Sequence, residues 1–275
     1  MNVASPPSET HEVVTFKNVR MGFGEGEILR GVTFCVQERE TLILLGETGT
    51  GKTLTLKLAA GLLRPTAGRV KVLGSDVSEM SENALLEFRR KIGFVFQEGA
   101  LFDSMTVADN VGYRLREDGV DEDEVETRVR EVLKFVELEH TLDQVPSELS
   151  GGMKRRVSIA RALISRPAIV LYDSPTAGLD PVTSQTIITL ILRLRDVYGV
   201  TAILATHRLQ DGFALANFRF DEETKRVLRV YPQGKDAGHC AVTKFMVYHD
   251  GGIYFEGEPD QLETTRDAYL KRFLV

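Results

Sequence analysis

The stretch GETGTGKT, residues 46–53, decides the fold of this chain. It follows the apolar run TLILL at residues 41–45, and the segment KTLTLKLAAGLL that begins at Lys52 carries apolar residues at helical spacing. A strand, a glycine-rich loop and a helix therefore follow one another, as in a βα unit of a parallel sheet. In that setting the stretch fits the phosphate-loop pattern G-x-x-x-x-G-K-[ST].

The residues of this loop have the chemistry that nucleotide phosphates require. Glycines allow successive backbone N–H groups to face phosphate oxygens, and the start of the helix adds favourable partial charge. Lys52 is expected to neutralise the β and γ phosphates, and the Thr53 hydroxyl to bind magnesium. The expected nucleotide-binding residues of the loop and its helix are Gly46, Glu47, Thr48, Gly49, Thr50, Gly51, Lys52, Thr53 and Thr55.

Three later apolar runs end in polar residues that suit the same site. They are GFVFQ at 93–97, AIVLYD at 168–173 and TAILATH at 201–207, and each has the continuous apolar character of a strand buried in a parallel sheet. We expect Asp173 to bind magnesium, Gln97 to offer its amide oxygen to the metal, and His207 to donate to the γ-phosphate. Ser174 follows Asp173, where a nucleotide hydrolase would need a second carboxylate as general base. Serine is no base at neutral pH, so hydrolysis is expected to be impaired.

A second helix start also suits an anion. In LSGGMKRRVSIARALIS, residues 149–165, Ser150 is placed as an N-cap, Gly151 and Gly152 follow, and an apolar stripe continues through Val157, Ile159, Ala160 and Leu163. The chain has one phosphate loop and no internal repeat. This second start is therefore expected to face the nucleotide of another copy in a two-fold dimer.

The remaining segments suggest a mixed α/β domain with additions. VVTFKNV at 13–19, LRGVTFCV at 29–36 and TLILLG at 41–46 predict a layer of short strands. The segment 121–138 predicts a helix with Val125, Val129, Val132 and Val136 on one stripe, inside a helical lobe at about 101–165. Segments 218–232 and 244–258 resemble hairpins. The expected division is a flexible tail at 1–12, a domain at 13–258 with an atypical insertion at about 217–244, and a helical segment at 259–275.

Composition excludes several classes of function. Acidic residues outnumber basic ones, 40 to 34, for a net charge of -6, which argues against a nucleic-acid partner. Cys35 and Cys240 stand far apart without a cluster, so neither a disulfide framework nor a zinc site is expected. No apolar run approaches the length of a membrane span, and the N-terminal residues lack a signal-peptide pattern. A cytoplasmic location is expected.

These motifs, in this order, resemble the ATPase subunits of ABC transporters over nearly the whole chain. The carrying residues are the loop at 46–53, Gln97, LSGG at 149–152, AIVLYD at 168–173, AGLD at 177–180 and His207. The resemblance implies a P-loop NTPase fold of ABC type. Its central, mostly parallel sheet would be flanked by helices, with an antiparallel β layer and an inserted helical lobe. ATP with Mg²⁺ would be the cofactor, and the Mg²⁺ ligands would be Thr53, Gln97 and Asp173.

The resemblance also implies roles for single residues. Phe23 would stack on adenine where the family usually has tyrosine, and Gln97 would link the γ-phosphate to membrane permease subunits. The turn at 150–152 would bind ATP across the dimer, and Asp180 would communicate between the two sites. The family has a glutamate at the position of Ser174, and whether the serine is natural or engineered stays open at this point.

The finer assignment rests on about twenty residues. FQEGALFDSMTVADNV at 96–111, LRE at 115–117 and Met153 in place of the usual glutamine resemble the Mla/MCE group, which implies lipid traffic between bacterial membranes and an MCE-type lipid-binding partner. The expected subunit is held at the inner face of the cell membrane by its permease, as a homodimer or beside a different ATPase. The alternatives are the ATPase of an amino-acid or metal importer and, in another class, a soluble ABC protein.

Overall fold

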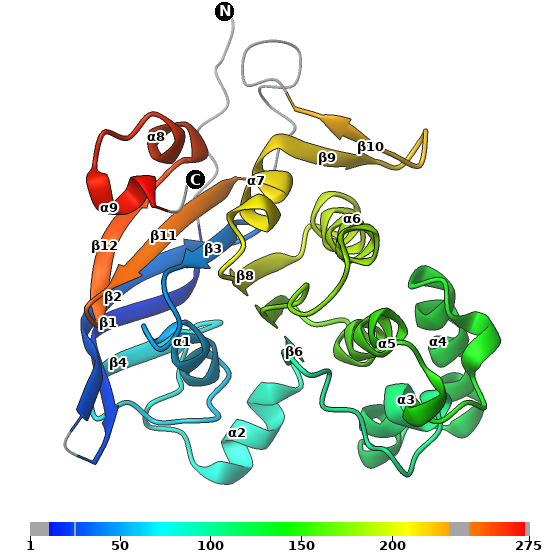
Figure 1. Cartoon of the computed structure of the whole chain (residues 1–275). Coiled ribbons are helices and arrows are strands. Elements are labelled where there is room, and N and C mark those ends of the chain that lie inside the picture. Colours follow the sequence, from blue (N-terminus) through cyan, green and yellow to red (C-terminus); the bar gives the residue numbers. More distant parts are fainter. Residues whose placement is uncertain (1–10, 25, 231–241, 273–275) are drawn as a thin grey trace, which may run out of the picture.

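The centre of the molecule is a six-stranded, mostly parallel sheet (Figure 1). The computed structural model describes residues 11–24, 26–230 and 242–272, so Cys240 lies outside the described residues. The strand order is β12-β11-β3-β8-β7-β6, and only the β11–β12 pair is antiparallel. The strands are β3 (Thr41–Leu45), β6 (Ile92–Val95), β7 (Ile169–Asp173), β8 (Thr201–Ala205), β11 (Thr243–His249) and β12 (Gly252–Gly257). The expected central sheet is confirmed.

Apolar runs select the inner positions of this sheet. All five residues of each of β3, β7 and β8 are buried, as required of strands covered on both faces. Each of these strands leads into a helix at its carboxyl end. The helices are α1 (Lys52–Ala59), α6 (Pro181–Tyr198) and α7 (Leu209–Asn217). Parallel strands end at one common edge, so this topology gathers the loop at 46–53, Asp173 and His207 along the same edge.

An antiparallel sheet in the order β2-β1-β4-β5 covers α1 from the other side. Its strands are β1 (Glu12–Phe23), β2 (Gly26–Gln37), β4 (Ala67–Val72) and β5 (Ser75–Asp76). Phe16 and Phe34 stack in its core with ring centroids 4.6 Å apart. The expected layer of three short strands is therefore wrong in detail. β1 and β2 are each 12 residues long and bury alternate residues, whereas the run at 41–45 is buried throughout and belongs to the central sheet.

Helices fill the region between β6 and β7. They are α3 (Val107–Glu117), α4 (Glu122–Phe135) and α5 (Gly151–Leu163), with short 3₁₀ turns at Glu139–Thr141 and Pro146–Glu148, while α2 (Glu82–Arg89) precedes β6. Val125, Val129 and Val136 are buried as expected, but Val132 is only partly buried and Leu133 takes its place in the core. The burial pattern advances four residues at a time, which leaves Val132 on one flank of the stripe. No described helix is both long and apolar enough to span a membrane.

The atypical segment after α7 forms a hairpin that packs on α6. Its strands are β9 (Phe218–Asp221) and β10 (Arg226–Arg229). The Arg195 side chain, 3% exposed, pairs with Asp196 at 2.6 Å and donates to the carbonyls of Leu215 and Phe218. Phe220 is only 9% exposed, so this part of the predicted insertion is packed against the domain and is not a solvated excursion. The rest of the predicted insertion, residues 231–241, lies outside the described residues.

The hairpin predicted at 244–258 is confirmed as β11 and β12. After it come two short helices, α8 (Pro259–Glu263) and α9 (Ala268–Lys271), beside β11 and β12 (Figure 1). The division of the chain into tail, domain and C-terminal segment stays a prediction.

Candidate nucleotide site

The loop at 46–53 has a backbone that only glycine fits at two positions. Gly46 has φ +142° and Gly51 has φ +103°. A Cβ at Gly51 would lie 2.4 Å from Leu29 Cδ2, and one at Gly46 would lie 2.8 Å from the carbonyl oxygen of Tyr248. These glycines let the loop turn tightly between β3 and α1. Glu47, Thr48 and Gly49 are exposed, which leaves the outer side of the loop open to a ligand.

Lys52 folds back over this loop. Its Nζ donates to the carbonyl oxygens of Gly46 and Glu47, both at 2.7 Å. Burial lowers the pKa of the Lys52 ammonium, against the opposing charges of Asp173 and Glu47. A partly desolvated ammonium that is held only by neutral carbonyls would form stronger, charge-assisted hydrogen bonds with a phosphate. The loop therefore fits the β and γ phosphates that the sequence predicts for it.

Thr53 and Asp173 meet at the edge of the sheet. The Thr53 hydroxyl donates to Asp173 Oδ1 at 2.9 Å, and the Asp173 residue is only 6% exposed. Burial raises the pKa of the Asp173 carboxyl, although the Thr53 hydrogen bond and the charges of Lys57, Lys52 and Arg155 oppose that shift. A buried carboxylate beside a hydroxyl is a set of hard oxygen ligands that suits Mg²⁺. When bound, ATP would bring the phosphoryl group and Mg²⁺ would neutralise part of its charge.

Thr55 was expected to bind nucleotide, but the structure turns it away from the loop surface. It is fully buried, and its hydroxyl donates to the Gly51 carbonyl at 3.0 Å and lies 3.0 Å from the Tyr248 hydroxyl. Thr55 supports the loop from behind because its hydroxyl is used within the core. Tyr248, a fully buried tyrosine on β11, is not among the residues predicted from the sequence.

Gln97 and His207 lie at the carboxyl ends of their strands and are both exposed. Gln97 lines the same groove as Asp173, together with Lys57 and Glu98. Within the described chain, no hydrogen bond or ion pair holds the His207 side chain, which leaves the imidazole available. Arg155, missed by the sequence analysis, is 7% exposed and donates to the Phe96 carbonyl at 2.7 Å, so it fixes the backbone just before Gln97.

The residues around His207 are fixed by a buried network. Asp211, 3% exposed, accepts from the hydroxyls of Thr176 and Thr206. Arg208 donates to the Thr176 carbonyl at 3.3 Å and to the Ser184 hydroxyl at 2.9 Å. This network ties the turn after Asp173 to the turn after β8. An apolar residue would not satisfy the hydroxyls of Thr176 and Thr206, which explains an aspartate in the core.

Ser174 has a left-handed backbone with φ +47°. Its N–H donates to the Ala205 carbonyl at 2.8 Å, and its own carbonyl accepts from Ala177 at 3.0 Å. The turn is thus well formed, and the side chain is partly exposed at the edge of the site. A hydroxyl stands where a carboxylate would be needed to accept a proton from water.

The second helix start is built as expected. The Ser150 hydroxyl accepts from the Met153 N–H at 3.3 Å, and Gly151 is exposed. A Cβ at Gly152 would lie 2.3 Å from Thr183 Cγ2, so this glycine lets α5 approach the start of α6. No hydrogen bond or ion pair between described residues joins 150–152 to 46–53.

Two further predicted residues lie at the surface. Asp180 caps α6 and accepts from Thr183, whose hydroxyl lowers the pKa of this exposed carboxyl. Phe23 stands at the end of β1 with 59% of its surface exposed, as a stacking aromatic would. Gly46, Lys52, Thr53, Asp173 and Gln97 are therefore brought together in one region. Asp180, Ser150 and Gly151 face solvent.

The fold and the site define a P-loop nucleotide-binding domain. The family profile described as ABC transporter matches residues 29–177. The chain is 39% identical over 72% of its length to the methionine import ATP-binding protein MetN of Bifidobacterium longum, and 36% identical over 76% to that of Brucella abortus. The alignments span only 50% and 57% of those relatives, so the chain matches about half of their length. The chain belongs to the ABC transporter family.

Solved structures agree with this assignment. The dimeric ATP-binding cassette MJ0796 bound to ADP and Pi shares 30% identity, with a TM-score of 0.73 over 89% of this chain and 98% of that one. CbiO1 from Clostridium perfringens, part of the ABC transporter complex CbiONQ, shares 26% identity, with a TM-score of 0.74 over 96% and 95%. The expected fold is confirmed, and the chain is an ABC-type ATPase domain that binds ATP with Mg²⁺. The similarity to methionine importers does not support the Mla/MCE assignment.

Proposed function

We propose that this chain is the ATPase of an ABC importer for an amino acid, with methionine as the first substrate to test. The carrying observation is the 36–39% identity to methionine import ATP-binding proteins over 72–76% of the chain. The lipid-transport interpretation rests on residues 96–117 and Met153 alone. The importer, given above as an alternative, therefore takes its place.

The test is uptake of radiolabelled L-methionine by cells that lack this chain. We expect uptake to fall and to return with the wild-type chain but not with Lys52→Ala, because Lys52 is the cation of the phosphate loop. Normal methionine uptake in the deleted cells, together with altered lipid composition of the outer membrane, would support the lipid transporter instead.

The chain is proposed to act as one of two ATPase subunits on a permease, at the inner face of the membrane. Ser150 and Gly151 are exposed, and the turn at 150–152 makes no hydrogen bond or ion pair to the loop at 46–53 within the described chain. A complete site therefore needs a second subunit, which Asp180 would also face. Light scattering with ATP and Mg²⁺ tests this, with a doubled mass for a homodimer. A strict monomer at saturating ATP, with the permease also present, would contradict it.

Hydrolysis by this subunit is proposed to be slow. General-base assistance is typically worth about 10²- to 10⁴-fold in rate, and Ser174 lacks the required carboxylate. We expect Ser174→Glu to raise the steady-state ATPase rate by a factor in that range. Ser174→Gln, which has similar size but no base, is the matched control and should leave the rate low.

Two results would overturn this assignment. The first is an ordinary rate for the serine form that Ser174→Glu does not increase. The second is a rate that falls with Glu98→Gln, because Glu98 lines the same groove as Asp173 and would then be the base. If the partner is a different subunit with a glutamate at this position, the turn at 150–152 would complete the working site of that partner.

A further inference from the structure

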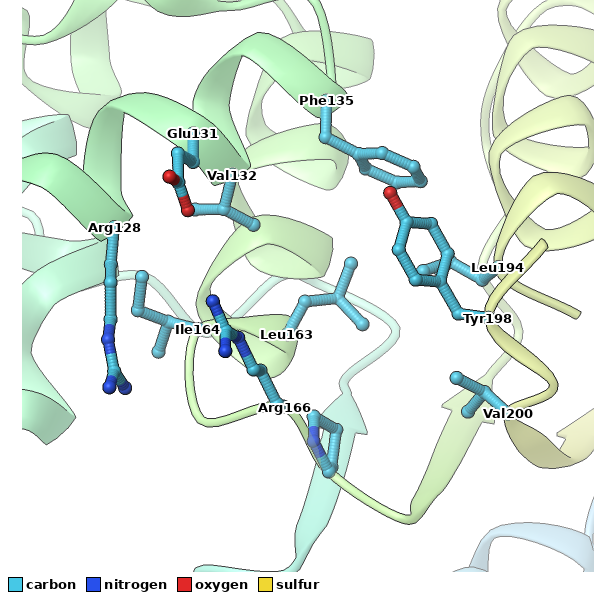
Figure 2. A pocket seen from close by; sticks show the side chains of 11 residues that line it. Arg128, Glu131, Val132, Phe135, Leu163, Ile164, Arg166, Leu194, Tyr198 and Val200 are labelled. Carbon is cyan, nitrogen blue, oxygen red and sulfur yellow. The ribbon is translucent and has the colours of Figure 1, made fainter. Parts of the chain in front are cut away.

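A second pocket lies at the opposite edge of the central sheet from the nucleotide site. It has a volume of about 370 Å³, and its walls come from α4, from the loop between α5 and β7, and from the end of α6 with the loop to β8 (Figure 2). Pro167 and Val200 line it just before β7 and β8 begin. The pocket is thus at the amino ends of the two strands whose carboxyl ends lead to Ser174 and His207.

The floor and one side of the pocket are apolar. Val132, Leu163 and Leu194 contribute aliphatic surface, and Phe135 and Tyr198 form an edge-to-face pair with ring centroids 5.8 Å apart. Tyr198 keeps 60% of its surface exposed at the rim. The partly exposed Val132 and Tyr198 are explained if an apolar group fills the space between them.

Three charged side chains line the same pocket. Arg128 is paired with Glu124 on its own helix. Arg166 is exposed, and no hydrogen bond or ion pair holds its guanidinium within the described ranges. Figure 2 shows the Arg166 side chain extending toward α4, from which the Glu131 carboxylate points back toward Arg166, and the two groups form no ion pair.

The backbone conformation at Arg166 is unusual for an arginine. Arg166 has φ +51°, a left-handed conformation that glycine or asparagine adopts at lower cost after a helix. The guanidinium gains no internal partner from that position. It is directed instead toward the pocket, where Arg128 is already paired with Glu124, so Arg166 is the lining cation that has no ion pair among the described residues.

We propose that this pocket binds a small monocarboxylate with an apolar body. The carboxylate would lie on Arg166, whose fork of N–H groups matches two carboxylate oxygens. The body would pack against Phe135, Leu163 and Tyr198. A pocket of about 370 Å³ is at the lower end of the range of roughly 300–1,000 Å³ that holds small ligands. Glu131 would disfavour a second negative charge.

Two probes with the same body and opposite charge test the ligand class. We would titrate 3-phenylpropanoate and 2-phenylethylamine into the full chain by calorimetry, without nucleotide. We expect 3-phenylpropanoate to bind and to raise the unfolding temperature, since a ligand of the folded state stabilises it. The amine should not bind. Absence of carboxylate binding at millimolar concentration, or equal binding of both probes, would overturn the proposal.

Variants locate the binding on these residues. Arg166→Gln should weaken 3-phenylpropanoate binding about tenfold or more, because one charge-assisted hydrogen-bonded contact is lost. Glu131→Gln should tighten it, because a like charge is removed. Arg130→Gln, an exposed arginine of the same helix outside the pocket, is the matched control and should change nothing.

A second type of variant guards against a folding defect. Val132→Phe places a larger side chain in the pocket and should block binding. Because Val132 is partly exposed, the variant should still fold. Thermal unfolding of each variant checks this. Unchanged binding in both Arg166→Gln and Val132→Phe would show that the carboxylate binds elsewhere and would refute the site.

Discussion

The N-termini of α1 and α5 are both suited to bind an anion, but they differ in their capping residues and in their charged side chains. At α1 the helix begins after Gly51, whose φ is +103° and which offers no side-chain cap, and Lys52 supplies a cation above the loop. At α5 the Ser150 hydroxyl caps its own helix, and the exposed Gly151 follows with no acidic residue in the first turn. One end carries a charge for the ligand, whereas the other presents mainly backbone and a hydroxyl.

This difference shows how a site can be divided between subunits. The α1 end also has Thr53 and Asp173 at 2.9 Å, so charge neutralisation and metal ligands are already in place there. The α5 end can add hydrogen bonds from its exposed backbone, and no acidic residue of its first turn opposes a phosphate. We therefore expect binding energy for a single nucleotide to come from α1, and energy for association of two subunits to come from α5.

The largest expected effect is at α1. Lys52→Ala should lower ATP affinity by about 100-fold or more, because charge-assisted hydrogen bonds to phosphate contribute roughly 1.5–3 kcal/mol each. Fluorescence titration with a labelled ATP analogue measures this. Lys71→Ala, an exposed lysine on β4, is the control. A near-normal ATP affinity of Lys52→Ala would show that the start of α1 does not supply most of the binding energy for a single nucleotide.

The next effect belongs to α5 and concerns association only. A Cβ at Gly151 would lie 3.7 Å from Leu179 Cδ2, an ordinary contact, so Gly151→Asp should fold. Its carboxylate would repel the γ-phosphate of the opposite subunit, and ATP-dependent mass doubling should be lost while single-chain affinity stays within about threefold. Gly151→Asn, equal in size and uncharged, should associate more than the aspartate form. An equal loss of ATP affinity in the single chain would show that the turn at 150–152 acts on the nucleotide of its own chain and not on that of the opposite subunit.

A moderate effect is expected on the stability of the ligand-free chain. The pKa of the Asp173 carboxyl is raised chiefly by burial, so the unfolded chain ionises this group at lower pH than the folded one. The contribution of Asp173 to the free energy of unfolding is therefore most favourable below the pKa that this group has in the unfolded chain. It is lost as the pH rises through the pKa that the group has in the folded chain. Asp173→Asn should therefore unfold at a higher temperature than wild type at pH 7, with the difference shrinking toward acid pH. A lower unfolding temperature at pH 7 would show that the carboxylate stabilises the empty site.

The smallest effect is expected behind the loop. Tyr248→Phe removes the partner of the Thr55 hydroxyl, which keeps its bond to Gly51. We expect a loss of about 1 kcal/mol in stability and a reduction of ATP affinity of only a few-fold. Denaturant unfolding and nucleotide titration give both values. Tyr113→Phe on α3 is the control, because this exposed hydroxyl makes no hydrogen bond to another described residue.

Local patterns predicted most of the nucleotide site, because its residues sit in short motifs. The glycines of the loop, the strand-end position of Asp173 and the Ser150 cap all depend on neighbours within a few residues. Tyr248 could not be found this way, since its partner Thr55 lies 193 residues away in sequence. Periodicity likewise predicted the helix α4. It did not predict that Leu133 is buried and Val132 only partly buried, because the surrounding helices determine which flank of α4 is covered.

The contact of Arg195 with the end of α7 separates the hairpin from the rest of the fold. Arg195 belongs to α6 and satisfies carbonyls of Leu215 and Phe218, the backbone groups at which the β9–β10 hairpin departs. Asp196 in turn receives the Phe220 N–H at 2.7 Å. The junction of the hairpin is therefore held mainly by two side chains of α6, Arg195 and Asp196. Because these contacts are to backbone groups, the side chains of the hairpin beyond the junction can change while the junction stays closed, and such changes act on a surface apart from the loop at 46–53.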